Sequence, residues 1–328
     1  EGVASHEQID TIIENGGGFR MGPFRLMDLI GIDVNYTATK SIYEQTFHEP
    51  RYRPHLIQDQ MVGQKALGKK TGRGFYQYEG EESARKPDGS PGAVQKDWEV
   101  YFTPGTWAPN LVEKCRQAGF KIALPAGGHP QKGSAGSRIG IVIAGTSENL
   151  HEHLQAMDQS LPPEVPLLCQ GADVTFSQLA PALVRPERFA TFDGLFMHYG
   201  KSVTLVGGPF LREDIRTEVR SFFHDLDYST VWINESPGLV LPRTVCALVN
   251  EAAFAAGEGV AEPDTIDTAM KLGTNYPRGP IEWGRQIGFD KVVQVLEHLR
   301  SEYGEERYRV APLLRRWSRL GRRSKENR

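Results

Sequence analysis

Residues 1–33 read EGVASHEQIDTIIENGGGFRMGPFRLMDLIGID, and residues 258–290 read EGVAEPDTIDTAMKLGTNYPRGPIEWGRQIGFD. These stretches align without a gap at a separation of 257 positions, and 13 of the 33 aligned pairs are identical, where chance would give about two. Self-similarity at so long a separation is typical of a duplicated supersecondary unit, because solenoid repeats recur at much shorter periods. The chain is therefore predicted to hold two copies of one unit.

The same local pattern is expected in both copies. Residues 5–15 and 262–273 are predicted to form short helices, and a Gly-Pro turn then leads into a second helix over Phe24–Ile30 or Ile281–Ile287. Proline suits the first helical turn because it has no N–H that needs a partner. Ser5 and Asp264 are the expected N-caps of these short helices. Gly16 and Gly273 are expected to end them.

The second copy begins with a segment that the first copy lacks. Residues 243–257 carry apolar residues at helical spacing and run directly into the repeated block. We therefore expect Glu1 to lie inside a domain, with a helix of at least 15 residues absent before it. The alternative is a divergent first copy that never had this helix.

The chain changes character between the two copies. Residues 79–97 are polar and rich in glycine, proline and charge, which is typical of a linker. Over residues 98–235, short β-like runs alternate with helical stretches such as Asn149–Leu161 and Arg212–Leu226, and this predicts a mostly parallel α/β layer. The expected strands are Val100–Phe102, Lys121–Leu124, Ile139–Ala144, Pro166–Cys169, Ala190–Phe192 and Val203–Val206. The predicted domains are residues 1–78, 98–235 and 236–321, with a basic tail over 322–328.

Composition limits the class of protein. A net charge of -3, with 39% apolar and 24% charged residues, is ordinary for a globular enzyme and argues against a surface built for nucleic acid. Cys115, Cys169 and Cys246 lie far apart without a CxxC pair, so neither a disulfide framework nor a four-ligand zinc site is expected. No apolar run is long enough for a membrane span, and a cytoplasmic location fits best.

Two motifs in the first copy resemble a known family. Residues 21–33, MGPFRLMDLIGID, resemble the PMGPFELLDxxGLD signature of 3-hydroxyacyl-CoA dehydrogenase C-terminal domains. Residues 67–78, LGKKTGRGFYQY, resemble the LGRKTGKGFYxY segment that closes the same domain. In the second copy, residues 236–243, SPGLVLPR, resemble the family's SPGFVVNR lead into that domain. Motifs in family order are more specific together than alone.

The resemblance implies a fold class that is mainly α with an α/β middle. Two helical domains of the 6-phosphogluconate-dehydrogenase C-terminal type would flank a shortened, degenerate Rossmann-like domain, as in the C-terminal part of long bacterial tandem forms. For the parent protein it implies NAD-dependent oxidation of 3-hydroxyacyl-CoA to 3-oxoacyl-CoA in fatty-acid or aromatic-acid degradation. This chain would carry the dimerisation and substrate-cleft domains, and the catalytic Rossmann domain would lie upstream of Glu1.

No NAD site is expected in this chain. Such a site needs a glycine-rich turn whose backbone N–H groups reach the pyrophosphate, and an acidic residue that holds the ribose. By the resemblance the turn falls on residues 103–108, TPGTWA, where Gly105 alone is retained between Thr103 and Ala108. After the second strand, where a carboxylate is expected, residues 124–128 read LPAGG.

The family's hydride-transfer residues are also absent at the matching positions. The general-base histidine falls on Phe196, the orienting glutamate on Gly207 and the asparagine on Pro242. His198 lies two residues beyond the first of these, and a two-residue shift along a strand moves a ring by roughly 6–7 Å. No catalytic residue is therefore predicted in this chain.

Weaker candidates for binding remain. Lys69, Lys70 and Arg73 could place positive groups near a CoA phosphate, or they could form a turn that delivers Phe75 and Tyr76 to the core. His151 and His153 have the residue type of metal ligands, but their i, i+2 spacing splits them across a helix, so no metal site is predicted.

The partners expected for this chain are an acyl-CoA substrate and the missing Rossmann domain. The two copies are predicted to pack on each other as an internal pseudo-dimer, or to form a homo-oligomer; neither nucleic acid nor a membrane is expected. The alternative is a non-catalytic assembly or acyl-CoA-binding module, whose middle domain would need a pocket lined by Trp107, Asn110 and Lys121.

Overall fold

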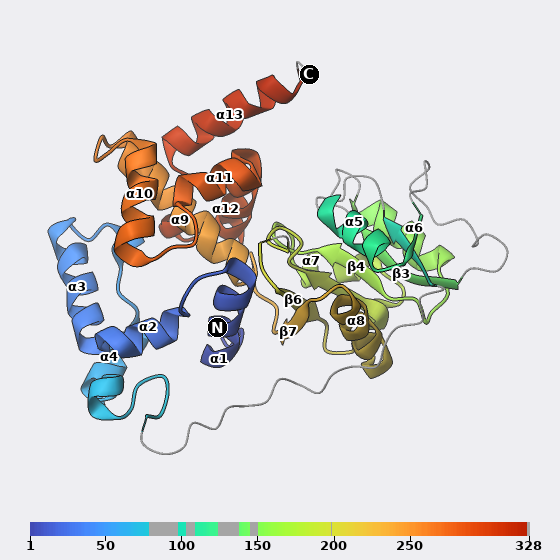
Figure 1. Ribbon diagram of the computed structural model, residues 1–328, viewed down its shortest axis with the longest axis horizontal. Coiled ribbons are helices and arrows are strands. Elements are labelled where there is room, and N and C mark those ends of the chain that lie inside the picture. The colour runs from blue at the N-terminus through green and yellow to red at the C-terminus, as the bar shows by residue number, and fades with distance from the viewer. Residues whose placement is uncertain (79–97, 103–108, 124–137, 145–149, 198, 327–328) are drawn as a thin grey trace. The chain divides into compact units, whose positions relative to one another are not determined.

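The computed structural model describes residues 1–78, 98–102, 109–123, 138–144, 150–197 and 199–326 (Figure 1). The chain forms two compact units. The first consists of Glu1–Ala4, Asn15–Gly17 and Ser90–Cys246, and the second consists of Ser5–Glu14, Gly18–Gly89 and Ala247–Arg328. Both helical copies of the repeat therefore fall mainly in the second unit. The predicted linker, residues 79–97, lies outside the described residues.

The first unit is built on a seven-stranded sheet of order β2-β1-β3-β4-β5-β6-β7. All neighbouring strands are parallel except β5 and β6, which confirms the predicted, mostly parallel layer. Its strands are β1 (Trp98–Phe102), β2 (Lys121–Ala123), β3 (Arg138–Ala144), β4 (Leu167–Gln170), β5 (Phe189–Phe192), β6 (Ser202–Gly207) and β7 (Ser229–Ile233). Its helices are α5 (Pro109–Gln117), α6 (Leu150–Ser160), α7 (Phe176–Leu179) and α8 (Glu213–Asp225).

The core of this unit lies between the sheet and its helices. Strands β4 and β5 are buried along their whole length, as expected for central parallel strands that read as continuous apolar runs. Helix α8 contributes Val219, Phe222 and Phe223, all fully buried in one cluster with residues of β1, β5 and β6. Strand β7 was not among the predicted strands, and it pairs in parallel with β6 over five residues.

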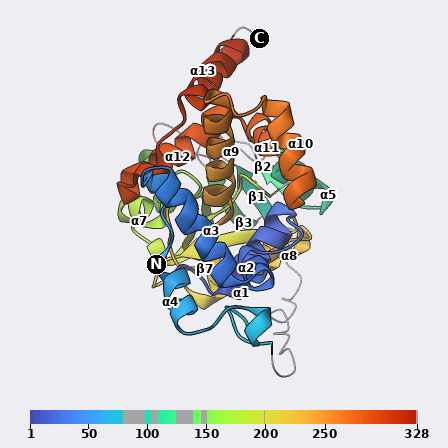
Figure 2. The ribbon, with the colours of Figure 1, turned by 90° about the vertical axis from the view of Figure 1, so that its left-hand side faces the viewer.

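The second unit is helical, and both copies of the repeat contribute to it (Figure 2). The first copy contains α1 (His6–Thr11), a π-helical turn (Ile12–Gly16), α2 (Pro23–Ile30), α3 (Ile32–Gln45), η2 (Pro50–Tyr52), α4 (Leu56–Gly63) and η3 (Lys69–Thr71). The second copy contains α9 (Leu241–Gly257), α10 (Pro263–Thr274), α11 (Pro280–Ile287), α12 (Phe289–Tyr303), η6 (Glu306–Tyr308) and α13 (Pro312–Glu326).

A buried carboxylate explains the identical residues of the repeat. In the first copy Asp10, 1% exposed, accepts hydrogen bonds from the backbone N–H groups of Phe24 and Arg25 at the start of α2. The equivalent carboxylate of the second copy accepts from two backbone N–H groups at the start of α11 in the same way. A Cβ on Gly22 would lie 2.3 Å from Asp10, so the Gly-Pro turn must lack a side chain there. Each copy thus satisfies the unpaired N–H groups of one helix from the helix before it.

Two of the predicted helix boundaries in the second copy are wrong. Asp264 was expected to cap α10, but Glu262 holds the N-cap position and Pro263 begins the helix. Gly273 lies inside α10, which ends instead at Asn275 with φ 55. Ser5 does cap α1, through a capping box with Gln8.

Two further boundaries differ from the prediction. The helix expected over residues 5–15 is α-helical only as far as Thr11 and continues as the π turn Ile12–Gly16. The predicted basic tail, residues 322–328, is largely part of α13, which continues to Glu326. The strong helix over residues 243–257 is confirmed as α9.

Candidate functional site at the contact between the helical copies

The two helical copies share a second short segment, which lies beyond the aligned stretches 1–33 and 258–290. Residues 49–53 read EPRYR and residues 305–309 read EERYR, so the separation here is 256 rather than 257. Both segments fold into one turn of 3₁₀-helix, with Glu49 or Glu305 at the N-cap and Arg53 or Arg309 at the C-cap. The backbone angles of Arg53 (φ -58, ψ 120) and Arg309 (φ -55, ψ 122) are nearly identical.

These two turns contact each other, and their ion pairs are reciprocal. Arg53 Nη2 lies 3.5 Å from a carboxylate oxygen of Glu305, and Arg309 Nη2 lies 3.4 Å from a carboxylate oxygen of Glu49. By the repeat, Arg53 is equivalent to Arg309 and Glu49 is equivalent to Glu305. Reciprocal contacts between equivalent residues are the signature of an isologous, two-fold interface.

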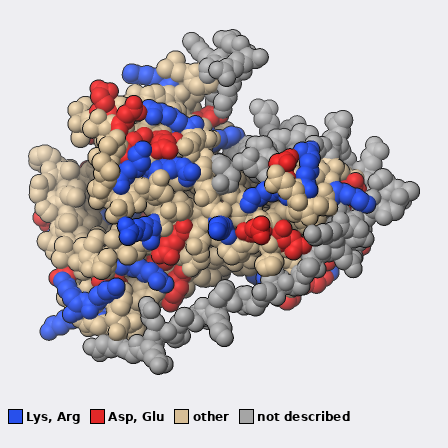
Figure 3. Space-filling view, in the orientation of Figure 1, with Lys and Arg blue, Asp and Glu red and all other residues tan. Residues whose placement is uncertain are grey.

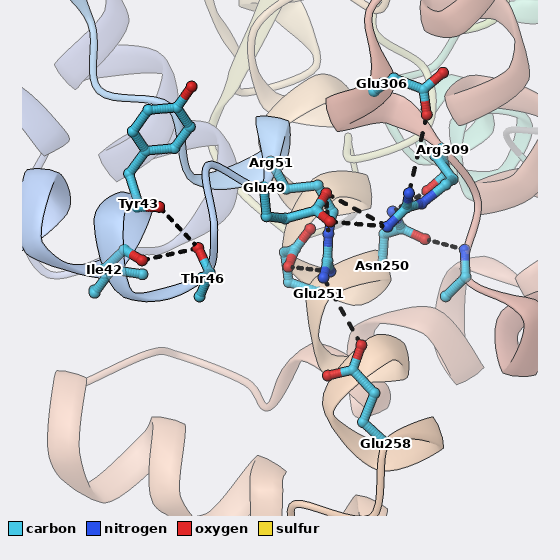
Figure 4. A network of polar contacts seen from close by, with 11 residues as sticks. Ile42, Tyr43, Thr46, Glu49, Arg51, Asn250, Glu251, Glu258, Glu306 and Arg309 are labelled. Atoms are coloured by element: carbon cyan, nitrogen blue, oxygen red, sulfur yellow. Dashed lines mark hydrogen bonds and ion pairs between the residues drawn. The ribbon is translucent and has the colours of Figure 1, made fainter.

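Arg51 lies at the centre of this contact and has a side chain that is only 5% exposed (Figure 4). Its guanidinium pairs with Glu49 at 3.3 Å in its own copy, and with Glu251 at 3.0 Å and Glu258 at 3.8 Å in the second copy. Its Cζ atom also lies 3.9 Å from the ring centroid of Phe254 on α9. A buried guanidinium needs several acceptors at once, and here both copies supply them.

The charges around Arg51 are unequally stabilised. Burial disfavours the charged form of Glu49, but Arg309 and Arg51 outweigh this effect and hold the pKa of that carboxyl below its ordinary value. Burial raises the pKa of Glu251 in spite of Arg51. Asn250, one residue earlier on α9, donates to the carbonyl of Arg309 and accepts from the N–H of Ala311, and thereby fixes the chain between η6 and α13.

The two family-like motifs of the first copy meet at a second buried carboxylate. Asp28, 1% exposed, accepts hydrogen bonds from the backbone N–H groups of Phe75 and Tyr76 and from the Tyr78 hydroxyl. A Cβ on Gly74 would lie 2.1 Å from Asp28, which accounts for glycine in the closing segment. The signature and the closing segment are therefore one structural device, held together by Asp28.

The predicted CoA-contacting cations lie on this closing loop. Lys70 Nζ is 2.5 Å from Asp33, and Lys69 Nζ lies 5.6 Å from the centroid of the Tyr78 ring. The carbonyl of Arg73 accepts a hydrogen bond from the N–H of Gly68 at 2.9 Å. The side chains of Lys69 and Lys70 and the backbone of Arg73 thus make contacts within the first copy.

The positions matched to hydride transfer offer none of the required groups. Phe196 is 1% exposed and lies in a turn that follows β5, not on a strand as predicted. Gly207 ends β6, and a Cβ there would lie 2.4 Å from Leu211, which occupies the space that a glutamate would need. Pro242 is in the first turn of α9 and has no side-chain donor.

Several predicted positions lie outside the described residues: Thr103, Gly105, Trp107, Ala108, residues 124–128 and His198. Asn110 lies in α5, and Lys121 is exposed on β2. His151 Nε2 is 3.0 Å from the carbonyl oxygen of Gln178. Among the described residues, no three His, Cys, Asp or Glu side chains are arranged to hold a metal ion.

Three general features of the described residues also bear on function. In the described part of the chain, no helix combines the length and apolar character that crossing a bilayer requires. Lys, Arg, Asp and Glu side chains are interspersed over much of the face shown in Figure 3. Cys115, Cys169 and Cys246 are buried free thiols.

Comparison with known proteins identifies relatives of this chain. It is 31% identical over 315 residues to 3-hydroxyadipyl-CoA dehydrogenase of Escherichia coli. This alignment covers 96% of this chain and 54% of that protein. A probable 3-hydroxybutyryl-CoA dehydrogenase of Bacillus subtilis is 31% identical over 190 residues, covering 55% of this chain and 64% of the relative. A crystal structure of 3-hydroxybutyryl-CoA dehydrogenase from Escherichia coli K12 superposes with a TM-score of 0.70 and 30% identity, covering 98% of this chain and 56% of that chain.

The chain spans about half the length of the first of these relatives and of the solved structure. The family model for the 3-hydroxyacyl-CoA dehydrogenase C-terminal domain matches residues 1–78 and 238–328, which include both copies of the repeat. The matched ranges include Asp10, Asp28 and the paired turns around Arg51. The chain therefore belongs to the 3-hydroxyacyl-CoA dehydrogenase family, through two copies of its C-terminal domain.

Proposed function

We propose that this chain is the pairing and substrate-cleft part of an NAD-dependent 3-hydroxyacyl-CoA dehydrogenase. The whole protein would oxidise the 3-hydroxyl of an acyl-CoA thioester in fatty-acid or aromatic-acid degradation in the cytoplasm. The catalytic Rossmann domain would lie outside this chain, and the two helical copies would act as an internal pseudo-dimer. The buried free thiols suit a reducing compartment.

The reciprocal ion pairs between η2 and η6 carry this proposal. A pairing surface that two separate subunits would otherwise provide is built here from two copies in one polypeptide. Arg53 with Glu305, and Arg309 with Glu49, are the repeat-equivalent halves of that surface. Arg51 adds a desolvated centre, which is where interfaces concentrate their binding energy.

The matched positions do not fit a hydride-transfer site. A general base must stand within hydrogen-bond reach of the substrate hydroxyl and needs a partner to orient it. Phe196 can neither accept nor donate a proton, and Leu211 blocks a carboxylate at position 207. NAD would accept the hydride in the parent enzyme, at a site outside this chain.

The positive side chains at residues 69, 70 and 73 give a weaker proposal for acyl-CoA contact. Lys70 is 44% exposed although it pairs with Asp33, so a phosphate could compete for its ammonium group. The structural role remains the stronger explanation, because the same loop delivers Phe75 and Tyr76 to Asp28. Binding of acyl-CoA without the nucleotide domain would favour the alternative function, a non-catalytic assembly or acyl-CoA-binding module.

The test is calorimetric titration of the chain with NADH and with acetoacetyl-CoA, alongside absorbance measurement of NADH consumption. The proposal predicts neither NADH binding nor NADH consumption. Heat on titration with acetoacetyl-CoA alone, lost in the variant Lys70→Ala, would support the binding-module alternative. Consumption of NADH would contradict the assignment of Phe196, Gly207 and Pro242, and His198 would then be the residue to replace.

A further inference from the structure

Two short segments of the first copy belong to the first unit, which is built on the sheet, and not to the helical unit. They are Glu1–Ala4 and Asn15–Gly17. By the repeat, they correspond to residues 258–261 and 272–274 of the second copy, which belong to the helical unit. The equivalent segments therefore have different surroundings in the two copies.

The segment at residues 1–4 is tied to the end of β7 and the start of α9. The backbone N–H of Asn234 donates to the carbonyl of Val3 at 2.8 Å, and its side-chain amide donates to the carbonyl of Gly2 at 2.7 Å. Arg243 Nη1 lies 3.0 Å from a carboxylate oxygen of Glu1. Polar groups of the first unit thus hold both the backbone and the charge of this segment.

The segment Asn15–Gly17 packs against the turn that precedes β6. The backbone N–H of Lys201 donates to the carbonyl of Asn15 at 2.6 Å. A Cβ on Gly200 would lie 2.2 Å from the same carbonyl oxygen, so this turn approaches the segment too closely for a side chain. Gly16 is accordingly buried.

The equivalent segments of the second copy are open to solvent. Val260, the equivalent of the half-buried Val3, is 72% exposed. Thr274 is exposed, whereas Gly17 at the equivalent position is buried. Among the described residues, Val260 and Leu272, the latter 79% exposed, are the most exposed large apolar side chains of the second copy. A single exposed apolar residue is common, but both of these fall on the segments that the first copy uses for contact.

An aromatic pair relates these segments by the two-fold contact of the copies. Phe19 and Tyr276 are repeat equivalents, and their ring centroids lie 5.2 Å apart. A residue that contacts its own equivalent lies close to a two-fold axis. The helices that precede the two rings end alike, at Gly18 with φ 72 and at Asn275 with φ 55. A group that contacts residues 15–17 therefore has a symmetry-related position beside residues 272–274.

We propose that residues 258–261 and 272–274 form the docking surface for a second α/β domain, the catalytic Rossmann domain of the whole protein. This inference rests on the proposed function and names the part of this chain that the outside domain contacts. The occupant is of the same kind as the first unit, because that unit holds the equivalent segments of the first copy. The sheet unit of a second copy of this chain is already engaged with its own residues 1–4 and 15–17.

The contacts of the first copy predict those of the docked domain. A basic side chain should pair with Glu258, which is 58% exposed, as Arg243 pairs with Glu1. An amide side chain at the end of a strand should donate to the carbonyl of Gly259, as Asn234 donates in the first copy. The backbone is already suited to this contact, because Gly259 has φ 74 and its equivalent has φ 66.

The experiment compares maleimide alkylation of Val260→Cys in this chain and in the whole parent protein, followed by mass spectrometry of the peptide that carries the position. The three native cysteines of this chain are buried. We expect alkylation to be about tenfold slower in the whole protein and to approach the rate of Val3→Cys, the matched position that this chain already covers. Leu320→Cys on α13, 59% exposed and outside both segments, should react equally fast in both proteins.

Equal alkylation of Val260→Cys in the two proteins would overturn the inference. Slow alkylation in this chain that dilution relieves would assign the surface to a second copy of the chain, and would also overturn it.

A photoreactive benzophenone side chain at position 260 of the whole protein identifies the occupant. We expect a cross-link to the stretch after the last strand of the catalytic α/β domain, the counterpart of Asn234. A cross-link to a helical domain instead would overturn the inference. None of these readouts uses NADH or acyl-CoA. Consumption of NADH by this chain alone would refute the proposed function, whereas an uncovered Val260 in the whole protein would refute the docking surface alone.

Discussion

At the scale of single residues, buried carboxylates give the family-like motifs their physical meaning. The sequence showed that Ile-Asp-Thr and Gly-Pro recur in both copies, but it could not show that the aspartate caps the helix that the proline begins. The partners lie 14 and 15 residues apart across an irregular turn, beyond the reach of local capping rules. Asp28 escaped prediction for the same reason, since its partners lie 47 to 50 residues away.

Replacing Asp267 with alanine should cost about 2 kcal/mol of unfolding free energy, because two N–H groups at the start of α11 lose a charged acceptor. Asp264 lies one turn earlier on the same helix, and its side chain is 85% exposed and paired with Arg285. Asp264→Ala should cost about 0.5 kcal/mol or less. Urea denaturation of both variants tests this, and equal losses would show that Asp267 is not a cap of this strength.

Asp193 should make the first unit less stable as the pH rises. Burial raises the pKa of its carboxyl to about 7, although the N–H groups of Leu195 and Phe196 donate to it and oppose this rise. Between the ordinary value near 4 and about 7, the folded state holds a proton that the unfolded state has lost, so stability falls by a few kcal/mol and then levels off.

Asp193→Asn should remove this component while keeping a carbonyl acceptor for the same N–H groups. The unfolding free energy of the variant, relative to the parent chain, should therefore rise between pH 4 and pH 7. Asp227→Asn, at an exposed carboxylate that follows α8, serves as the control. A pH-independent difference between Asp193→Asn and the parent would contradict the account.

At the scale of elements, the sequence located most of the sheet because central parallel strands read as apolar runs. It missed β7, Ser229–Ile233, which is only partly buried and follows α8 after a short turn. The sequence alignment at a separation of 257 also missed the equivalence of residues 49–53 with residues 305–309. Phe47 and His48 both adopt positive φ after α3, where Gly304 alone does so after α12, and this extra residue shifts the register to 256.

Arg51→Ala should destabilise the second unit by about 3 kcal/mol, because it leaves the carboxylates of Glu49 and Glu251 beside each other without their buried cation. Arg53→Ala, in the same segment, removes a side chain that is 54% exposed and should cost about 0.5 kcal/mol. Urea unfolding of the two variants measures the contrast. Equal and small losses would mean that the centre of the contact contributes little.

At the scale of the whole molecule, the duplication could be predicted from the sequence, but the surface through which the copies meet could not. Isologous contacts depend on residues such as Arg53 and Glu305, which are 252 positions apart and carry no signal of their own. The family relationship followed from motifs that are structural, since Asp28 and its glycines hold the closing segment. The sequence therefore identified the family more readily than it identified what this part of the protein does.

The central claim is that two copies of one domain pair about a two-fold contact within one chain. Its most direct test is cross-linking of Arg53→Cys with Glu305→Cys by a short bismaleimide at sub-micromolar protein, and of the reciprocal pair Glu49→Cys with Arg309→Cys. The account predicts that both pairs form a cross-link within a single chain, with equal efficiency. Cross-links only between chains, or in one pair and not its reciprocal, would contradict the internal two-fold pairing.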